Sequence, residues 1–545
     1  MKRILNSGVL NWAWRCSEGH RRSILASCLC GIMNVFAGLA FVWISKLLVD
    51  AAINPDTDRG AIIILSVSMV ALMLVELFFS FSTTYLANKT EIKIKNDLRE
   101  TLYDHLLGTR WDRIAKIHSG DLINRLTEDV RVVAGTVCGT VPSMVLMLIQ
   151  FAAAFAMLCT MNWKLAVCIV IIIPFFFLLS RVYIKRTRKM TAEIRKSDSM
   201  IQSTIQEGLQ HRAVVQTLEC EQEMEDRLSN YQTLLYSQTM NRTKFGIFNR
   251  SLVRMCYIAC YATAFIWSIW NLRTGVMTYG MMIAFLQLVA RIQNPMVGAA
   301  QLVPGIVHSL SSIDRLMEME GITSEEKGAP MKISSPAGIR ITNLSFIYED
   351  GTTKIFDNFS YDFRPGSKTV VMGETGIGKS TLVKLLLALL HPNQGSIVIY
   401  GDKEVEVCAE TRCNMIYVPQ GNSLLEGTIR SNLLLGNTAA TDDMMLDALH
   451  IAAADFVSEL PDGLDTYCGE SGIGLSEGQA QRIAIARALL RNGSILLLDE
   501  FNSSLDENTA TTLMERLIQS RRSSTIIFIS HRPEVGNFCD NILRL

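Results

Sequence analysis

Six long apolar segments constrain this chain more than any other feature of its sequence. Glu76 is the single charged residue that they contain. They lie at residues 23–45, 61–87, 132–162, 165–180, 255–272 and 276–290. A helix needs about 20 mostly apolar residues to cross a bilayer core, and buried helices of soluble proteins rarely stay uncharged for so long. We therefore expect six membrane-spanning helices, which make the first part of the chain an all-α membrane domain.

The connections between these segments alternate between short and long. Two of them, residues 88–131 and 181–250, are long and polar without being rich in glycine or proline, which favours helices that continue beyond the membrane. The short connections hold or adjoin three Lys and Arg residues, whereas five occur in residues 1–22, nine in 89–131 and twelve in 181–250. Because basic residues concentrate on the cytosolic side, the N-terminus and the long loops are predicted to be cytosolic. The expected location is the plasma (inner) membrane, with multiple passes.

A polar stripe runs along the sixth segment and continues past its end. Its members are spaced by four, three, four and three residues, a spacing that puts them on one face of a helix. They are Gln287, Arg291, Asn294, Gly298 and Gln301. Polar groups facing lipid are costly, so this face should meet an aqueous cavity or other helices. We hypothesise that it lines a pathway across the membrane; the alternative is that Arg291 reaches the inner interface or forms a structural pair, for example with Glu76.

The composition changes between residues 318 and 338, where turn-forming Glu, Gly, Ser and Pro residues replace the apolar segments. This composition is typical of a linker. Beyond it, residues 339–347 and 353–363 have strand character, and Asp350-Gly351 between them is a hairpin signal. Later strands alternate with helical stretches, which predicts an α/β sheet. The expected parts are a membrane domain with long cytosolic loops, a linker and an α/β domain, at residues 1–320, 321–338 and 339–545.

A glycine-rich motif follows the apolar run 369–372 and precedes residues 382–390, which can open a helix. The order of strand, glycine loop and helix is the context of a phosphate-binding P-loop. Glycines let the backbone turn its N–H groups toward a polyphosphate, and the helix N-terminus adds a partial positive charge. Lys379 can reach the terminal phosphates and the Ser380 hydroxyl can ligate Mg²⁺. The predicted nucleotide-binding residues are Gly373, Glu374, Thr375, Gly376, Ile377, Gly378, Lys379, Ser380 and Thr381.

The charge and cysteine content exclude some other classes of function. The chain has 52 basic and 52 acidic residues, so nothing in its net charge favours a nucleic-acid partner. Its 13 cysteines show no metal-binding spacing, and many lie within apolar runs. Buried, reduced thiols are therefore expected rather than a disulfide framework.

Two of the polar loops resemble those of a known family. The stretch from Trp111 to Val130 resembles the first intracellular loop of ATP-binding cassette (ABC) exporters, and Glu207 to Gln216 resembles the second. In that family, short transverse helices near these places dock on the nucleotide-binding domain. The motifs after residue 340 follow the order seen in cassette ATPases, so the resemblance implies ATP and Mg²⁺ as cofactors.

The same resemblance implies roles for an aromatic and an amide residue. Tyr348 lies 25 residues before Gly373, where the family places an aromatic that stacks on adenine. Val418-Pro419-Gln420 resembles the Q-loop. Gln420 would contact Mg²⁺ or the attacking water, and an amide suits that task because it donates or accepts without changing charge.

Leu475–Gln479 resembles the signature motif of the family, with Glu477 where glycine is commonest. A serine and a glycine at a helix start make a second anion site. In the family this site, here Ser476, Gly478 and Gln479, covers the γ-phosphate held by the other protomer, which implies a dimer. Glu470, just upstream, matches the X-loop of exporters.

The stretch from Ser494 to Glu500 is an apolar strand that ends in two carboxylates, the pattern of a Walker B strand. Asp499 would hold Mg²⁺ through water, and Glu500 would polarise the attacking water as general base. Phe501 and Asn502 depart from the small and hydroxyl residues usual after it, which puts the local packing in doubt. His531 follows another apolar strand and matches the switch histidine that contacts the γ-phosphate. The predicted catalytic residues are Glu500, His531 and Gln420, and the predicted Mg²⁺ ligands are Ser380, Gln420 and Asp499.

The fold class expected is a six-helix all-α transmembrane domain of the ABC exporter type, followed by an α/β P-loop ATPase domain. The resemblance implies a half-transporter that pairs with a second half-transporter and exports an amphiphilic drug, lipid or peptide. A homodimer is favoured because the set of ATPase residues is complete. One half of a heterodimer stays open. A regulatory protein that does not transport is disfavoured, because Lys379, Gln420, Asp499, Glu500 and His531 are all present. A P-loop kinase or GTPase explains neither the signature nor the membrane segments, and an importer usually keeps its permease on a separate chain.

Overall fold

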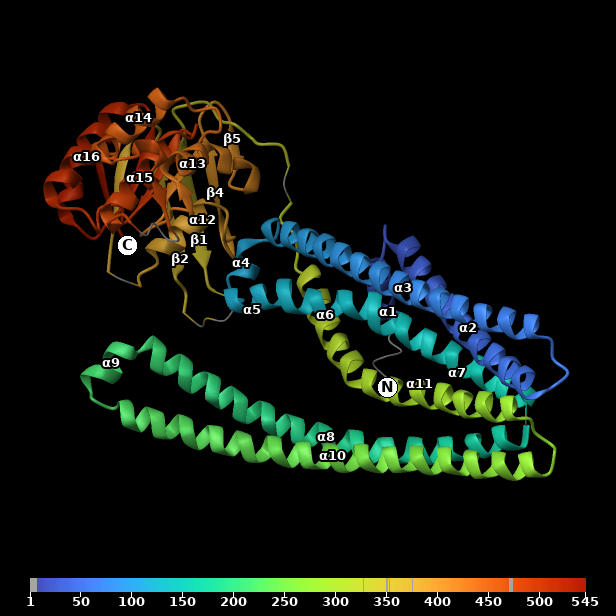
Figure 1. Cartoon of the computed structure of the whole chain (residues 1–545). Coiled ribbons are helices and arrows are strands. Elements are labelled where there is room, and N and C mark those ends of the chain that lie inside the picture. Colours follow the sequence, from blue (N-terminus) through green and yellow to red (C-terminus); the bar gives the residue numbers. More distant parts are fainter. Residues whose placement is uncertain are drawn as a thin grey trace. The chain divides into compact units, whose positions relative to one another are not determined.

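The computed structural model describes residues 7–161, 163–326, 328–348, 351, 353–374, 376–469 and 474–545. It gives only the backbone path at positions 7, 9–10, 163–182, 184–185, 253, 256, 260, 296–297, 299–301 and 303–304. Its contacts divide the chain into two compact units (Figure 1). The first comprises Met1–Asp104 and Ser119–Gly321, and the second comprises His105–His118 and Ile322–Leu545. The domain limits predicted from the sequence stay predictions. The segment His105–His118, which they place in the membrane domain, is grouped with the second unit by its contacts.

The first unit is built from helices, with two π-helical turns, η1 and η2, inside the third long one. Its elements are α1 (Ser7–Arg15), α2 (Arg21–Ile53), α3 (Arg59–Leu107), α5 (Ser119–Asn124), η1 (Arg125–Asp129), α6 (Val130–Gly135), η2 (Thr136–Thr140), α7 (Val141–Met161), α8 (Trp163–Gln210), α9 (Arg212–Thr217), α10 (Glu221–Arg273) and α11 (Tyr279–Glu320). Helices α3, α8 and α10 contain 49, 48 and 53 residues. At 1.5 Å per residue each extends over roughly 70–80 Å, more than twice a bilayer core of about 30 Å. Each helix therefore continues well beyond the membrane, as the polar loops predicted.

The six predicted membrane segments lie, in chain order, on α2, α3, the continuous run of α6, η2 and α7, then α8, α10 and α11. Within the described residues, four helices are long and apolar enough to cross a membrane by length and composition. These are α2, α3, the continuous helix Ser119–Met161 and α10. The predicted helical membrane domain is confirmed. Asn162, the last residue of the third predicted segment, lies outside the described residues.

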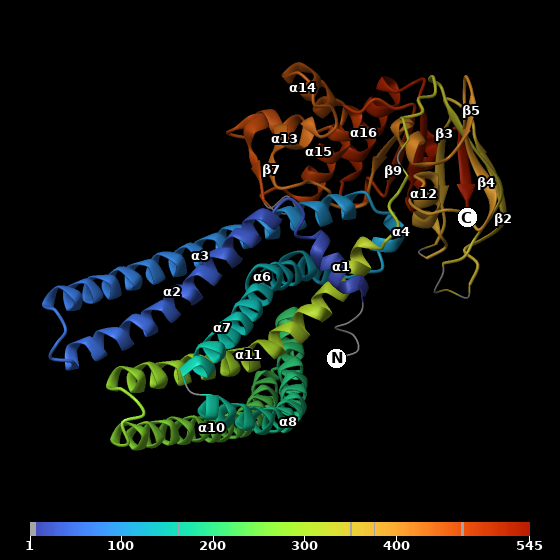
Figure 2. The ribbon, with the colours of Figure 1, turned by 90° about the vertical axis from the view of Figure 1, so that its right-hand side faces the viewer.

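The buried core of the first unit lies where α2, α7 and α11 pack together. Val42, Leu158, Leu288 and Ile292 are fully buried there. By contrast, apolar residues along α3, such as Phe81, remain exposed, as expected for side chains that face lipid. Helices α8 and α10 lie side by side as a long hairpin in both views (Figures 1 and 2).

The second unit contains a five-stranded parallel sheet in the order β11-β3-β10-β9-β6 and a four-stranded antiparallel sheet in the order β2-β1-β4-β5. A two-stranded pair, β7 with β8, lies apart from them. The strands are β1 (Gly338–Phe346), β2 (Phe356–Phe363), β3 (Lys368–Met372), β4 (Gln394–Tyr400), β5 (Glu404–Glu406), β6 (Met415–Val418), β7 (Gly427–Thr428), β8 (Tyr467–Cys468), β9 (Ile495–Asp499), β10 (Thr525–Ile529) and β11 (Asn541–Arg544). The helices are α4 (Trp111–Ile114), α12 (Lys379–Leu386), η3 (Ala409–Asn414), α13 (Ile429–Leu434), α14 (Asp442–Ile451), η4 (Asp455–Glu459), η5 (Gly463–Asp465), α15 (Glu477–Leu489), α16 (Glu507–Ser520) and η7 (Pro533–Phe538). The predicted α/β sheet is confirmed.

The parallel sheet is buried on both faces, which explains the continuous apolar runs of its central strands. All five residues of β9 and of β10 are buried. One face packs against α13 to α16, and the other packs against α12 and the antiparallel sheet. The predicted hairpin is also present, since β1 pairs antiparallel with β2, but β2 begins three residues later than predicted. Its pairing starts where Phe356 lies opposite Phe346, and Asp350 of the hairpin signal lies outside the described residues.

The segment His105–His118 is attached to the second unit by both backbone and side chains. Thr109 pairs with Ser324 in an isolated β-bridge, and the Lys384 ammonium lies 4.8 Å from the centre of the Trp111 ring. Trp111 opens α4, within the stretch that resembles the first intracellular loop. A contact between this loop and the ATPase unit therefore exists within one chain.

Candidate active site

Four strands of the parallel sheet bring the predicted catalytic motifs to one edge. Strands β3, β6, β9 and β10 run in the same direction, and Ile529 at the end of β10 pairs with both Val371 and Asp499. The P-loop follows β3, and Gln420 comes shortly after β6. Glu500 directly follows β9, and His531 comes shortly after β10. Because parallel strands end at a common edge, these segments converge there.

The P-loop connects β3 to α12, and two of its glycines have positive φ angles. Gly376 has φ +92° and Gly378 has φ +117°, a region that favours glycine. A Cβ on Gly378 would also lie only 2.6 Å from a methyl carbon of Ile355, so the loop is too close-packed for a side chain there. Thr375 lies outside the described residues. The loop thus has the backbone conformation that the glycine pattern predicted, with α12 starting directly after it.

Lys379 is the first residue of α12 and is buried. Its Nζ atom donates hydrogen bonds to the carbonyl oxygens of Gly373, at 2.7 Å, and Glu374, at 3.1 Å. The ammonium group therefore lies within the curve of the loop, where a phosphate chain would pass. Ser380, the next residue, is exposed at the helix N-terminus.

Tyr348 lies beside the P-loop helix. Its hydroxyl shares a hydrogen bond of 3.1 Å with the Thr381 hydroxyl, and its ring meets Phe346 edge to face at 5.0 Å. The side chain is partly exposed, which leaves part of the ring available for stacking. The structure thus brings Tyr348 and the P-loop together; its role toward adenine stays a prediction.

The three predicted catalytic side chains form one cluster. The Gln420 amide donates to a carboxylate oxygen of Glu500 at 2.5 Å, and the other oxygen lies 4.0 Å from Nδ1 of His531. Gln420 and His531 are exposed, whereas the Glu500 side chain is mostly covered. An acceptor carboxylate between an amide and an imidazole can bind and orient a water molecule, which is the geometry a general base requires.

Asp499 is the buried neighbour of this cluster. Burial, and secondarily the Glu500 charge, raise the pKa of the Asp499 carboxyl to about 6, while Lys379 and Lys384 oppose that rise. A divalent cation would offset the cost of keeping this carboxylate ionised. A carboxylate, a hydroxyl (Ser380) and an amide oxygen (Gln420) are the hard oxygen donors that Mg²⁺ prefers, so the predicted ligand set fits the ion.

The predicted signature residues form a helix start of their own. Ser476 caps α15: its hydroxyl accepts from the Gln479 backbone N–H at 3.2 Å, and the Gln479 side chain accepts from the Ser476 N–H at 2.9 Å. A Cβ on Gly478 would lie 2.6 Å from the backbone oxygen of Ser504, so only glycine fits there without a shift. Within the described residues, these three make no hydrogen bond to the P-loop, Gln420 or His531. Glu470 of the X-loop lies outside that part.

The structure also explains the two unusual residues after Glu500. Phe501 is fully buried against Phe528, with ring centres 5.4 Å apart, and Asn502 is buried with its amide oxygen 3.4 Å from the Ser530 hydroxyl. The doubt about local packing is therefore removed. Gln481 is a residue that the sequence reasoning missed: it is fully buried and donates to the Glu500 carbonyl oxygen at 3.2 Å. Its signal was a glutamine within the mostly apolar helix after the signature.

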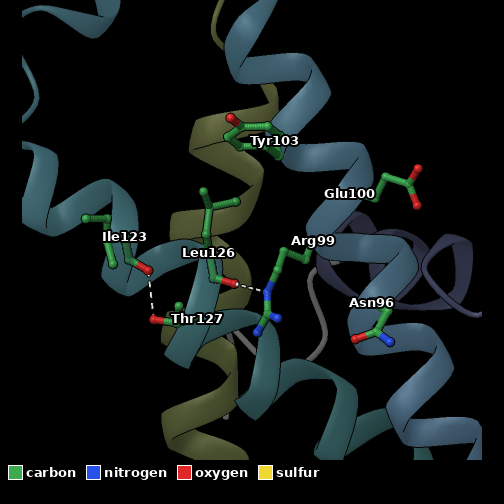
Figure 3. Close-up of a pocket in the computed structure, with 7 residues that line it drawn as sticks. All are labelled: Asn96, Arg99, Glu100, Tyr103, Ile123, Leu126 and Thr127. Atoms are coloured by element: carbon green, nitrogen blue, oxygen red, sulfur yellow. Dashed lines mark hydrogen bonds between the residues drawn. The ribbon is translucent and has the colours of Figure 1, made fainter. Parts of the chain in front are cut away.

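The described residues also form a hollow at the border of the Gln420–Glu500–His531 cluster and another one in the first unit. One of about 370 Å³ is bordered by His531, Asn502 and residues of α16 in the second unit. The other, of about 450 Å³, lies in the first unit between α3 and the start of the third long helix (Figure 3). There Arg99 donates to the Leu126 carbonyl at 3.2 Å, and the exposed side chains of Tyr103 and Ile123 also line the hollow.

A helical membrane unit fused to a P-loop ATPase unit defines an ATP-driven membrane transporter as the class of protein. Residues 24–296 match the family described as the ABC transporter transmembrane region, and residues 356–503 match the ABC transporter family of ATPase domains. The chain belongs to the ABC transporter family, with permease and ATPase in one polypeptide, and is an ATP-hydrolysing transporter of the exporter type.

Known proteins similar to this chain agree with that assignment. The chain is 29% identical over 468 residues to the ATP-dependent lipid A-core flippase of Pseudomonas fluorescens (strain Pf0-1), covering 85% of this chain and 78% of the flippase. It is 25% identical over 553 residues to YgaD of Bacillus subtilis (strain 168), named a candidate multidrug export ATP-binding/permease protein, covering 98% and 94% of the two chains. The solved structure of a bacterial Atm1-family ABC exporter with ATP bound has the same fold, with a TM-score of 0.81 at 21% identity, covering 96% of this chain and 93% of that chain.

Proposed function

We propose that this chain exports an amphiphilic molecule, a lipid, drug or peptide, out of the cytosol or between leaflets by alternating access. ATP hydrolysis at sites shared by two copies of the chain drives the movement. The observation that carries the proposal is the cluster of Gln420, Glu500 and His531 at the sheet edge that also holds the P-loop. Relatives named as a lipid A-core flippase and a candidate multidrug exporter support an amphiphilic cargo.

Each residue of the cluster has a separate task in hydrolysis. Lys379 and the N–H groups of the P-loop hold the phosphates, and Glu500 accepts a proton from water aligned with the γ-phosphate. Gln420 senses the nucleotide from the other side of Glu500, and His531 contacts the γ-phosphate. Mg²⁺, when bound through Ser380, Gln420 and Asp499, neutralises charge on the phosphate oxygens.

A second copy of the chain supplies the signature to each site. Ser476 lies at the N-terminus of α15, where free backbone N–H groups and a partial positive charge favour an anion. Within the described residues, this helix start makes no hydrogen bond to the P-loop of its own chain. This supports a head-to-tail pair in which each nucleotide lies between one P-loop and the opposite signature. A homodimer is favoured, since the chain carries the complete set of catalytic residues; a heterodimer with another half-transporter is the second candidate.

The long helices connect this site to the membrane. The hairpin of α8 and α10 ends at α9, where Leu209, Val214 and Leu218 are exposed apolar residues. Exposed apolar clusters of this kind are typical of interaction sites, and we assign this one to the ATPase unit of the second copy. The basic residues of the long loops support a cytosolic position for this end in the inner membrane.

We propose that the polar stripe of α11 lines the cargo pathway, together with the ion pair that Arg291 forms with Glu76. Arg291 lies 3.4 Å from Glu76, and a Cβ on Gly38 would lie 2.2 Å from a guanidinium nitrogen, so the charged group is held against α2 and α3. Gly298 faces Met147, whereas Asn294 is exposed, and the Gln301 side chain lies outside the described residues. The stripe is therefore partly structural, and Arg291 with Asn294 is the part proposed to meet cargo.

The test uses purified chain in liposomes with wild type and Glu500→Gln. We expect Glu500→Gln to bind a fluorescent ATP analogue with unchanged affinity while hydrolysis and cargo movement fall at least about a hundredfold. A lipid, peptide and drug panel then identifies the cargo by its stimulation of wild-type ATPase. Near-normal ATPase in Glu500→Gln would contradict the assignment. ATPase without movement of any cargo would favour the regulatory alternative.

A further inference from the structure

The backbone of Glu500 is held in a conformation that residues with a side chain rarely adopt. Its φ angle is +45°, in the left-handed region. Such a conformation persists only where surrounding contacts hold it, and it is commonest at functional sites. Three contacts hold this one: the Glu500 N–H donates to Ile529 at 2.9 Å, and its carbonyl accepts from the Ser503 N–H and the Gln481 amide, both at 3.2 Å. Of these, only the Gln481 contact comes from a side chain.

Gln481 lies in α15, five residues after the signature serine, and is fully buried. A backbone carbonyl can only accept, so the amide nitrogen faces Glu500. Within the described residues, the amide oxygen Oε1 of Gln481 accepts no hydrogen bond. Burying an unpaired polar atom is costly, and an apolar side chain of the same size would fill the space without that cost. What glutamine provides here, and an apolar side chain of the same size would not, is therefore the amide N–H that donates to Glu500.

A second contact joins the same helix to the same loop. Gly478 lies against the backbone of Ser504, close enough that a Cβ would be 2.6 Å from its oxygen. Helix α15 thus touches the loop 500–505 at two points, one near the signature and one at Glu500. A shift of α15 would move the backbone that carries the catalytic carboxylate.

We infer that Gln481 is a positioning residue for ATP hydrolysis: its amide holds the Glu500 backbone, aims the carboxylate at the attacking water, and links the signature helix to the base. The inference rests on the proposed function, in which Glu500 is the general base. The Gln481 amide contacts the Glu500 backbone and not its carboxylate. It acts through Glu500.

The test replaces the donor while keeping the volume. Gln481→Met is expected to lower kcat for ATP about tenfold to a hundredfold, as for a misplacement near 1 Å, while KM for ATP stays within about twofold. Because methionine fills the same space, the melting temperature should change little. The matched control is Leu489→Ala, a packing defect in the same helix. It should lower the melting temperature yet leave kcat of the folded protein unchanged. A Gln481→Met variant with wild-type kcat, or one whose loss follows its folded fraction as in the control, overturns the inference.

A double-mutant cycle separates action through Glu500 from other effects. In the Glu500→Gln background, Gln481→Met should cause no further loss of the residual single-turnover hydrolysis, because the group that it positions is already disabled. A full multiplicative loss in that background would overturn the inference. Failure of the proposed function is distinguishable, since wild type and Glu500→Gln would then hydrolyse ATP equally. If Glu500→Gln is blocked and Gln481→Met is not, only this inference fails.

Discussion

Adding a single methyl group at Gly478 should disable the ATPase. In Gly478→Ala the new Cβ would lie 2.6 Å from the Ser504 backbone oxygen and 3.2 Å from a methyl carbon of Leu505. A carbon and a carbonyl oxygen normally stay about 3.3 Å or more apart, so α15 and the loop after Glu500 must separate by roughly 0.7 Å. Backbone atoms cannot rotate away as a flexible side chain can. We expect a stability cost of about 1–3 kcal/mol and a kcat about tenfold to a hundredfold lower.

The assay is ATP hydrolysis by the detergent-purified chain, with ATP-analogue binding measured in parallel. Binding at the P-loop should be nearly unchanged, because the atoms nearest a Cβ on Gly478 belong to Ser504 and Leu505 and not to the P-loop. Gly536→Ala is the matched control, since the nearest atom to its Cβ is the end of the Ile542 side chain, at 3.2 Å, which can move. An ATPase rate for Gly478→Ala within twofold of wild type, at an unchanged melting temperature, would refute the reasoning from this close contact.

Two further predictions concern charged residues, one in each unit. Asp499→Asn should stabilise the protein free of Mg²⁺ and nucleotide at pH 7.5 by up to about 3 kcal/mol, because burial and Glu500 raise the pKa of the wild-type carboxyl from 3.8 to about 6. Since the wild-type carboxyl takes up a proton as the pH falls through 6, the difference in melting temperature should shrink and vanish near pH 4; a difference independent of pH would contradict this. Arg291→Ala removes the partner of Glu76 and is expected to reduce cargo-stimulated ATPase several-fold while basal ATPase changes little. Unchanged transport and unchanged stimulation would exclude Arg291 from the pathway.

The parts of the site that the sequence predicted are those in which a motif directly follows a buried strand. Lys379, Asp499 and His531 each come within a few residues of an apolar run that became β3, β9 or β10. Once these runs pair in parallel, their ends share one edge, and the residue types there limit the chemistry. The signature helix was predictable for a similar local reason, because Ser476 and Gln479 form the capping box that their spacing allows.

The remaining features depend on contacts between distant parts of the chain. The left-handed backbone of Glu500 and its hydrogen bond from Gln481 arise only when α15 packs against the loop that follows β9, which no local spacing reveals. Phe501 looked anomalous because its pocket is built by Phe528, 27 positions away. The sequence left two alternatives for Arg291. The side chain pairs with Glu76 at 3.4 Å, between α3 and α11, and its place in the cargo pathway stays a proposal. The grouping of His105–His118 with the second unit likewise follows from packing.

The central claim is that each ATP is hydrolysed between two copies of this chain, and cross-linking tests it most directly. One tagged copy would carry Ile377→Cys in the exposed P-loop, the other Ser476→Cys, both with Glu500→Gln to retain ATP. A disulfide forms only when the Cα atoms approach within about 7 Å. The account predicts a linked pair of chains that appears with MgATP and is missing when either cysteine is present alone. If a chain carrying both cysteines links only within itself, with no linked pair formed, each site is complete in one polypeptide and the account is wrong.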